Sequence, residues 1–72
     1  HSVIHDHCFL SSHVVVSGFV DIGESCFMGV NATVANNVSI GKNCLVGAGA
    51  LVLGDVEDDQ KVVGIWKHKK NE

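Results

Sequence analysis

Aliphatic residues recur at every sixth position along most of the chain. From Ile4 onward, nine successive members of this series are Ile4, Leu10, Val16, Ile22, Met28, Val34, Ile40, Val46 and Val52. The residue directly after each of them is mostly small, and the residue four places later is small and apolar. A period of six fits neither an α-helix nor a single alternating strand, and it indicates a coil of short parallel strands.

A longer period of eighteen residues lies on top of the short one. It relates Cys8, Cys26 and Cys44, and likewise Phe9, Phe27 and Leu45. Three hexads then complete one coil, and residues eighteen apart stack at the strand spacing of about 4.8 Å. The pattern therefore predicts an all-β fold, with a parallel β-helix of about three coils over residues 1–57 and a short C-terminal strand or tail over residues 58–72.

The corners of this coil fall three residues after each aliphatic position. These positions are occupied by His7, His13, Phe19, Ser25, Asn31, Asn37, Asn43, Gly49 and Asp55. Most of these residue types tolerate a positive φ, as a tight corner requires. Phe19 does not, and we expect the neighbouring Gly18 to take the strain there.

The stretch "IGESCFMGVNATVANNVSIGKNCLVGAGALV" resembles the hexapeptide-repeat acyltransferases, and the resemblance extends over residues 4–57. It implies a left-handed parallel β-helix, whereas the general crossover rule predicts a right-handed one. Within that family the chain is most similar to sugar O- and N-acetyltransferases of the sialic-acid O-acetyltransferase type. The implied function is acetyl-CoA-dependent acetylation of a hydroxyl or amine on a sugar or nucleotide sugar.

The residue before each aliphatic points outward and sorts the three faces. One face is mostly polar, with Val3, Asp21, Ser39 and Glu57; a second presents Phe9, Phe27 and Leu45; the third presents Val15, Thr33 and Leu51. Stacked apolar columns on so small a prism predict a buried interface. The family resemblance implies a homotrimer with acyl-donor grooves between neighbouring prisms.

The resemblance also implies where donor and base would lie. Small residues that let backbone approach the donor fall at Gly18, Gly29, Val30, Gly47 and Ala48, and Lys67 would meet a phosphate. Trp66 could stack on adenine or belong to a solvated terminus. By the resemblance the base is either His1, at or just after the family position, or a residue that this chain lacks. His13 is a second candidate by its position at the corner between the two apolar faces. The "HDH" at residues 5–7 looks like the family's His-acid pair but is out of phase with the repeat.

Composition excludes other function classes. Five Lys, no Arg and eight acidic residues give no basic footprint for nucleic acid, and no apolar run is long enough to span a bilayer. The three Cys are expected as buried packing residues in a reducing cytoplasm. No metal is expected, because His1, His7 and His13 diverge to three corners. The alternative to an enzyme is a trimeric scaffold that binds a partner without catalysis.

Overall fold

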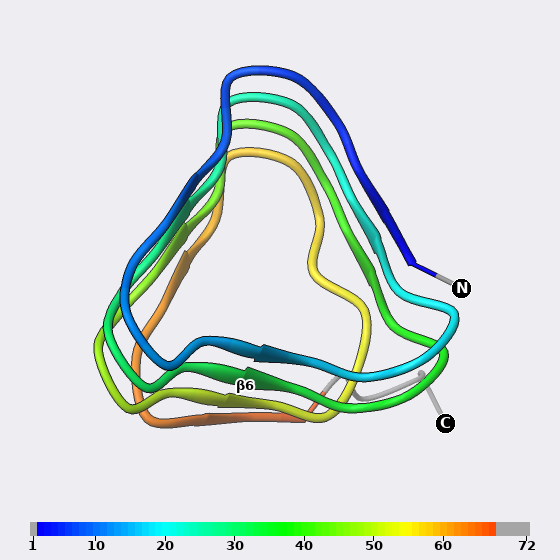
Figure 1. The fold of residues 1–72 in the computed structure, drawn as a ribbon. Coiled ribbons are helices and arrows are strands. Elements are labelled where there is room, and N and C mark those ends of the chain that lie inside the picture. The colour runs from blue at the N-terminus through cyan, green and yellow to red at the C-terminus, as the bar shows by residue number, and fades with distance from the viewer. Residues whose placement is uncertain (1, 68–72) are drawn as a thin grey trace.

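The computed structural model describes residues 2–67 as a triangular prism of short parallel strands wound about one axis (Figure 1). Within these residues the regular structure is all β. Each strand holds two residues: β1 (Val3–Ile4), β2 (Phe9–Leu10), β3 (Val15–Val16), β4 (Asp21–Ile22), β5 (Phe27–Met28), β6 (Thr33–Val34), β7 (Ser39–Ile40), β8 (Leu45–Val46), β9 (Leu51–Val52), β10 (Lys61–Val62) and β11 (Ile65–Trp66).

Three parallel sheets form the walls of the prism. The polar wall has the strand order β1-β4-β7, the apolar wall β10-β8-β5-β2, and the third wall β11-β9-β6-β3. Phe9 pairs with Phe27, and Phe27 pairs with Leu45, so residues eighteen apart lie side by side. This register confirms the predicted coil length.

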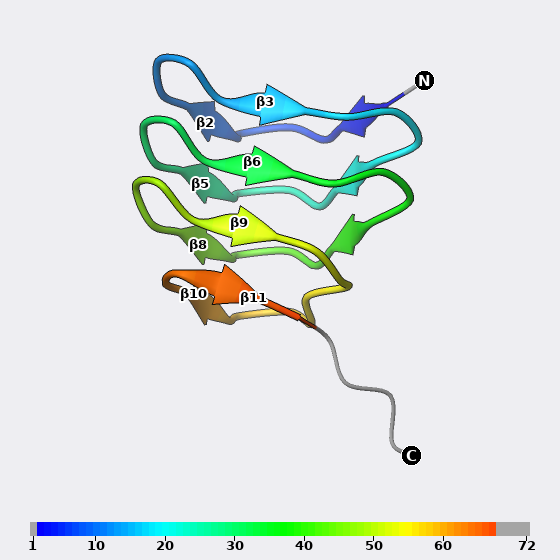
Figure 2. The same ribbon diagram turned by 90° about the horizontal axis from the view of Figure 1, so that it is seen from below.

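The coil is left-handed. From the N-terminus the chain runs counterclockwise in Figure 1, and Figure 2 shows that it recedes from the viewer of Figure 1 as it does so. The fold therefore follows the family resemblance and departs from the handedness rule for βαβ crossovers. No helix in the described chain is long and apolar enough to cross a membrane.

Three corners connect the walls. The first corner comprises residues 5–8, 23–26, 41–44 and 57–60; the second, residues 11–14, 29–32, 47–50 and 63–64; the third, residues 17–20 and 35–38. Eight of the nine predicted corner residues have positive φ: His7, His13, Phe19, Ser25, Asn31, Asn37, Asn43 and Gly49. The expectation that Gly18 takes the strain beside Phe19 is wrong, because Phe19 itself has a φ of +58°.

The core is a column of aliphatic and small side chains along the prism axis. Ile22, Met28, Val34, Val46 and Val52 are completely buried. In the first coil the equivalent Ile4 and Leu10 are 42% and 38% exposed, because no described strand covers that end of the prism. The six-residue series therefore identifies the core, and its burial is complete from the second coil onward.

The fourth coil is shorter than the others and was not predicted. Ile40 pairs with Val56 and Val46 with Val62, so these steps take sixteen residues rather than eighteen. The chain bends inward in Figure 1 where the third corner would otherwise continue. As a result Asp55, rather than the predicted Glu57, lies next to Ser39 on the polar wall, where its Oδ1 accepts a hydrogen bond from the Ser39 amide at 2.9 Å.

Candidate functional site

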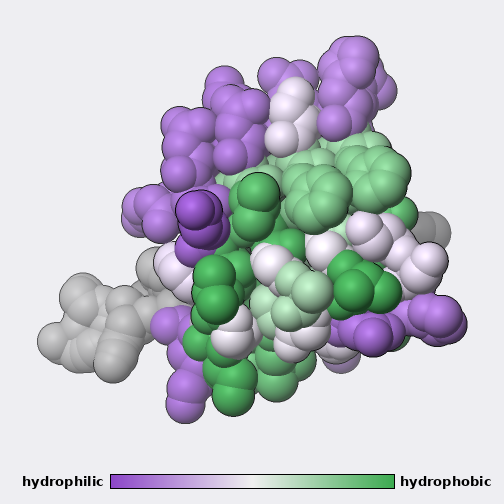
Figure 3. All heavy atoms as spheres, turned by 90° about the vertical axis from the view of Figure 1, so that its left-hand side faces the viewer, coloured by the Kyte–Doolittle hydropathy of each residue, from purple (hydrophilic) through white to green (hydrophobic). Residues whose placement is uncertain are grey.

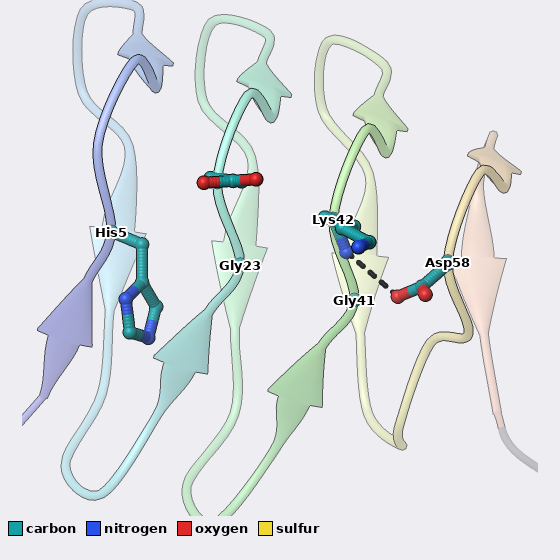
Figure 4. Close-up of a pocket in the computed structure, with 6 residues that line it drawn as sticks. His5, Gly23, Gly41, Lys42 and Asp58 are labelled. Carbon is teal, nitrogen blue, oxygen red and sulfur yellow. Dashed lines mark hydrogen bonds between the residues drawn. The ribbon is translucent and has the colours of Figure 1, made fainter.

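An open groove of about 320 Å³ runs along the first corner, parallel to the prism axis. It is lined by His5, Gly23, Glu24, Gly41, Lys42 and Asp58. Figure 4 shows these residues on successive coils, with His5 at the N-terminal end and Asp58 at the other. Stacking of the coils, with a step of eighteen residues from Glu24 to Lys42 and of sixteen from Lys42 to Asp58, thus brings one imidazole, one amine and two carboxylates to a single edge of the prism.

The floor of this groove is bare backbone. A Cβ on Gly23 would lie 2.8 Å from the Gly41 carbonyl carbon, so the coils are in direct backbone contact there. A Cβ on Gly41 would lie 2.6 Å from the Asp58 amide nitrogen. Asp58 closes the C-terminal end, because its Oδ1 accepts a hydrogen bond from the Lys42 amide at 2.9 Å.

A hydrogen bond joins His5 and Asp21 at the N-terminal end of the groove. His5 Nε2 and Asp21 Oδ1 lie 3.0 Å apart, and the two side chains are 51% and 58% exposed. The sequence interpretation considered only the adjacent Asp6 as an acid partner for this histidine. The stacking rule contains the signal that was missed, because Asp21 precedes Ile22, which pairs with Ile4.

Four of the five backbone positions expected to approach the donor lie at the second corner: Gly29, Val30, Gly47 and Ala48. Gly29 packs directly on the next coil, since a Cβ there would lie 2.6 Å from the Ala48 amide nitrogen. The Val30 and Ala48 amides donate no hydrogen bond within residues 2–67. They form a short ladder of backbone donors that an extended ligand with carbonyl groups can use.

The other two expected donor positions lie elsewhere. Gly18 belongs to the third corner, and its amide already donates a hydrogen bond to Asn36 Oδ1 at 2.9 Å. Lys67 follows β11 at the C-terminal end of the prism, on the third wall. The structure therefore brings neither of them to the second corner.

The apolar wall adjoins the second corner. Phe9, Phe27, Leu45 and Val30 are 58%, 41%, 42% and 41% exposed, and together they form the continuous apolar surface seen in Figure 3. The Phe9 and Phe27 rings are stacked, with centroids 5.3 Å apart and an angle of 6° between their planes. Columns of exposed aromatic and aliphatic side chains of this kind mark interaction surfaces.

Three residues considered for the site remain to be placed: His13, His1 and Trp66. His13 is exposed at the second corner, with a φ of +60°, and His1 lies outside the described residues. Trp66 packs against the C-terminal end of the hydrophobic core and is partly buried there. Its Nε1 donates a hydrogen bond to the Asp55 carbonyl at 2.9 Å. That indole therefore covers the C-terminal end of the prism.

The three cysteines form an interior column of free thiols. Cys8, Cys26 and Cys44 donate hydrogen bonds to the carbonyls of Gly23, Gly41 and Glu57 at 3.1, 3.0 and 3.1 Å. Burial raises the pKa of the Cys26 thiol from 9.0 to about 11, and a backbone hydrogen bond from Cys44 opposes this rise in part. Among residues 2–67 no group of three or more His, Cys, Asp or Glu is placed to hold a metal ion.

Comparison with known proteins gives one family and one structure. The family described as bacterial transferase hexapeptide (six repeats) matches residues 19–54, which are 36 of the 72 residues. A crystal structure of Neisseria gonorrhoeae serine acetyltransferase in complex with serine superposes with a TM-score of 0.57 at 22% identity. The match covers 85% of this chain and 39% of the serine acetyltransferase chain. No curated protein sequence matches the chain significantly.

Proposed function

Because the chain belongs to the bacterial transferase hexapeptide family, we propose that it carries the β-helix of an acetyl-CoA-dependent acetyltransferase. The proposed acceptor is a hydroxyl or amine of a sugar or nucleotide sugar, as in the sialic-acid O-acetyltransferase type. The proposed location is the cytoplasm, whose reducing conditions suit three stacked free thiols.

The second corner is the observation that carries this proposal. Pantetheine is an extended chain with two amide groups, and it needs backbone donors beside an apolar surface. The free amides of Val30 and Ala48 and the adjoining apolar wall supply both. At the first and third corners a side chain of the next coil already occupies one amide, through the Asp58–Lys42 and Asn36–Gly18 hydrogen bonds.

A homotrimer is the proposed assembly. The apolar wall leaves Phe9, Phe27 and Leu45 exposed, and burying them against a second prism removes apolar surface from water. A partner on this wall would also turn the open second corner into a groove between two chains. The proposed donor site is therefore completed by the neighbouring copy.

The first-corner groove suits a polar acceptor. Its side chains offer hydrogen-bond donors and acceptors from His5, Glu24, Lys42 and Asp58, which match the hydroxyls of a sugar. The similar Neisseria enzyme was crystallised with serine, so serine is the natural comparison acceptor. The proposed base is His1, at or just after the family position, or His13, at the corner between the two apolar faces.

The test is an acetyl-transfer assay on the purified chain. Release of the free CoA thiol is followed with acetyl-CoA and, in separate reactions, amino sugars, sialic acid, nucleotide sugars and L-serine. We expect acceptor-dependent release with a member of the sugar group. Release with serine alone would overturn the sugar assignment. Binding of acetyl-CoA without release for any acceptor would indicate a non-catalytic trimeric scaffold.

A further inference from the structure

The three cysteines of the chain stand at the first corner, each directly before a strand of the apolar wall. These strands, β2, β5 and β8, follow one another along the prism axis (Figure 2). Cys8 precedes Phe9 and Cys26 precedes Phe27, and the two phenylalanines are register partners. The Phe9 amide donates a hydrogen bond to the Cys26 carbonyl at 2.9 Å, so the backbones at Cys8 and Cys26 are held side by side.

Stacked cysteines at this spacing are within disulfide range. Paired strands lie about 4.8 Å apart, and a disulfide joins Cα atoms that are about 4.4–6.8 Å apart. The thiol of Cys8 points toward the second coil, because its Sγ donates a hydrogen bond to the Gly23 carbonyl at 3.1 Å. Cys26 lies on that same coil, at the same corner as Gly23. A bond between Cys8 and Cys26 therefore needs side-chain rotation rather than a large movement of the backbone.

The open N-terminal end of the prism makes the first thiol the accessible one. Cys8 is only partly buried, whereas Cys26 and Cys44 are each 2% exposed. Exposure favours oxidation of a thiol. The first coil is also the least covered, since its core residues Ile4 and Leu10 are 42% and 38% exposed. Oxidation is therefore expected to begin at Cys8, and Cys26 is the next thiol in the column.

We propose that Cys8 and Cys26 form a redox-sensitive disulfide that joins the first coil to the second, with a peroxide as the oxidant. The Cys8 sulfur bonds to one oxygen of hydrogen peroxide as the O–O bond breaks, which gives a sulfenic acid and water. The Cys26 sulfur then bonds to the Cys8 sulfur as the S–O bond breaks, and the hydroxyl leaves with the Cys26 proton as a second water. The two thiols lose two electrons to the peroxide, and a dithiol reductant reverses the step.

The position of Lys42 allows the bonded pair to be identified by mass. The purified chain is incubated with equimolar hydrogen peroxide, unfolded, treated with iodoacetamide and digested with trypsin without reductant. Cleavage after Lys42 leaves Cys8 and Cys26 in one peptide and Cys44 in the next. We expect the peptide of residues 1–42 to lack two hydrogen atoms and to carry no blocking group, while Cys44 is blocked. The incubation is long, because the raised pKa of Cys26 slows its attack near neutral pH.

Three serine variants test the choice of thiols. A serine hydroxyl keeps a hydrogen-bond donor for the carbonyl of the next coil. Cys44→Ser should form the disulfide as the wild type does, and Cys8→Ser and Cys26→Ser should not form it. Hydrogen exchange measured by NMR tests the joining of the coils. Exchange of the Phe9 amide should slow when the wild type is oxidised, return to its first rate with dithiothreitol, and stay unchanged in peroxide-treated Cys8→Ser.

The peptide map of the wild type decides the assignment even where a variant fails to fold. Three blocked cysteines after treatment with peroxide would overturn the proposal. A bond that links the peptide of residues 1–42 to that of residues 43–61 would show that Cys44 is one of the partners and overturn the pairing. A covalent dimer on a non-reducing gel would show that Cys8 reacts between chains, which also contradicts it. Unchanged exchange at Phe9 in the oxidised protein would contradict the joining of the two coils.

Discussion

The Trp66 indole donates a hydrogen bond to the Asp55 carbonyl at 2.9 Å and so ties the last strand to the bend that shortens the fourth coil. The same ring packs on the C-terminal end of the core. Trp66→Ala should therefore expose that end and lower the free energy of unfolding by about 2–3 kcal/mol, less than for a fully buried tryptophan. Urea denaturation at fixed protein concentration measures the change.

Trp66→Phe is the matched control for the indole. It keeps most of the ring packing and loses the Nε1 hydrogen bond, which is worth about 1 kcal/mol. The phenylalanine variant should therefore be intermediate between wild type and Trp66→Ala. Equal stability of wild type and Trp66→Ala would show that the indole does not cover the core.

Phe19 holds an unfavourable backbone conformation. Its φ is +58°, while Asn31, Asn37 and Asn43 occupy equivalent corners with nearly the same φ. A left-handed conformation costs a residue such as phenylalanine about 1 kcal/mol or more, and asparagine tolerates it better. Phe19→Asn should raise the free energy of unfolding by about 1 kcal/mol, and Asn37→Phe should lower it by a similar amount. Destabilisation by Phe19→Asn would show that the contacts of the Phe19 side chain outweigh the strain.

If the apolar wall is the trimer interface, a charge placed on it should dissociate the trimer. Phe27 lies at its centre, stacked on Phe9. Phe27→Lys should convert the proposed trimer into monomers, because a buried lysine charge in the interface has no partner. Sedimentation equilibrium measures the mass. Ser39→Lys, at the equivalent outward position of the polar wall, should leave the trimer intact, and dissociation by both substitutions alike would contradict the assignment of the interface to the apolar wall.

Cys26 predicts a pH dependence of stability in the alkaline range. Burial raises the pKa of this thiol from 9.0 to about 11, so the folded chain holds the proton more tightly than the unfolded chain. The stabilisation is complete below pH 9 and is lost as the pH rises toward 11. Urea denaturation of wild type should show the decline in this window, and Cys26→Ala should show a smaller one. Parallel declines in both proteins would contradict a buried, protonated thiol.

The six-residue pattern predicts most of the fold, because every coil repeats the same requirement for an aliphatic residue inside the prism. It fails at the fourth coil for a specific reason. Val56 is an inward residue in the unbroken frame and also in the shortened one, where it pairs with Ile40. The hydrophobic pattern therefore does not show that the fourth coil is two residues shorter. The one sign of it is Asp58, a polar residue six positions after Val52, where the pattern requires an aliphatic residue.

The site was harder to predict than the fold. Counting hexads along the chain assigned Gly18 to the donor positions. The structure places Gly18 at the third corner, because it follows β3, and its amide donates a hydrogen bond to Asn36 Oδ1. The His5–Asp21 pair depends on residues from two coils, so reading neighbours along the chain points to Asp6 instead. The eighteen-residue period already places Asp21 beside Val3, so the pair can be predicted across the coils but not along the chain.

The most direct test of the central claim is calorimetric titration of acetyl-CoA into the wild type and two glycine variants. A Cβ on Gly47 would meet only the Val62 carbonyl oxygen, at 3.4 Å, and a Cβ on Gly18 only Asn36 Oδ1, at 3.8 Å, so both Gly47→Ala and Gly18→Ala should fold. We predict saturable binding of one acetyl-CoA per chain, weakened in Gly47→Ala and unchanged in Gly18→Ala. Absence of binding to the wild type at millimolar donor would contradict the acetyltransferase account, and weakening by Gly18→Ala alone would contradict the second corner as the donor site.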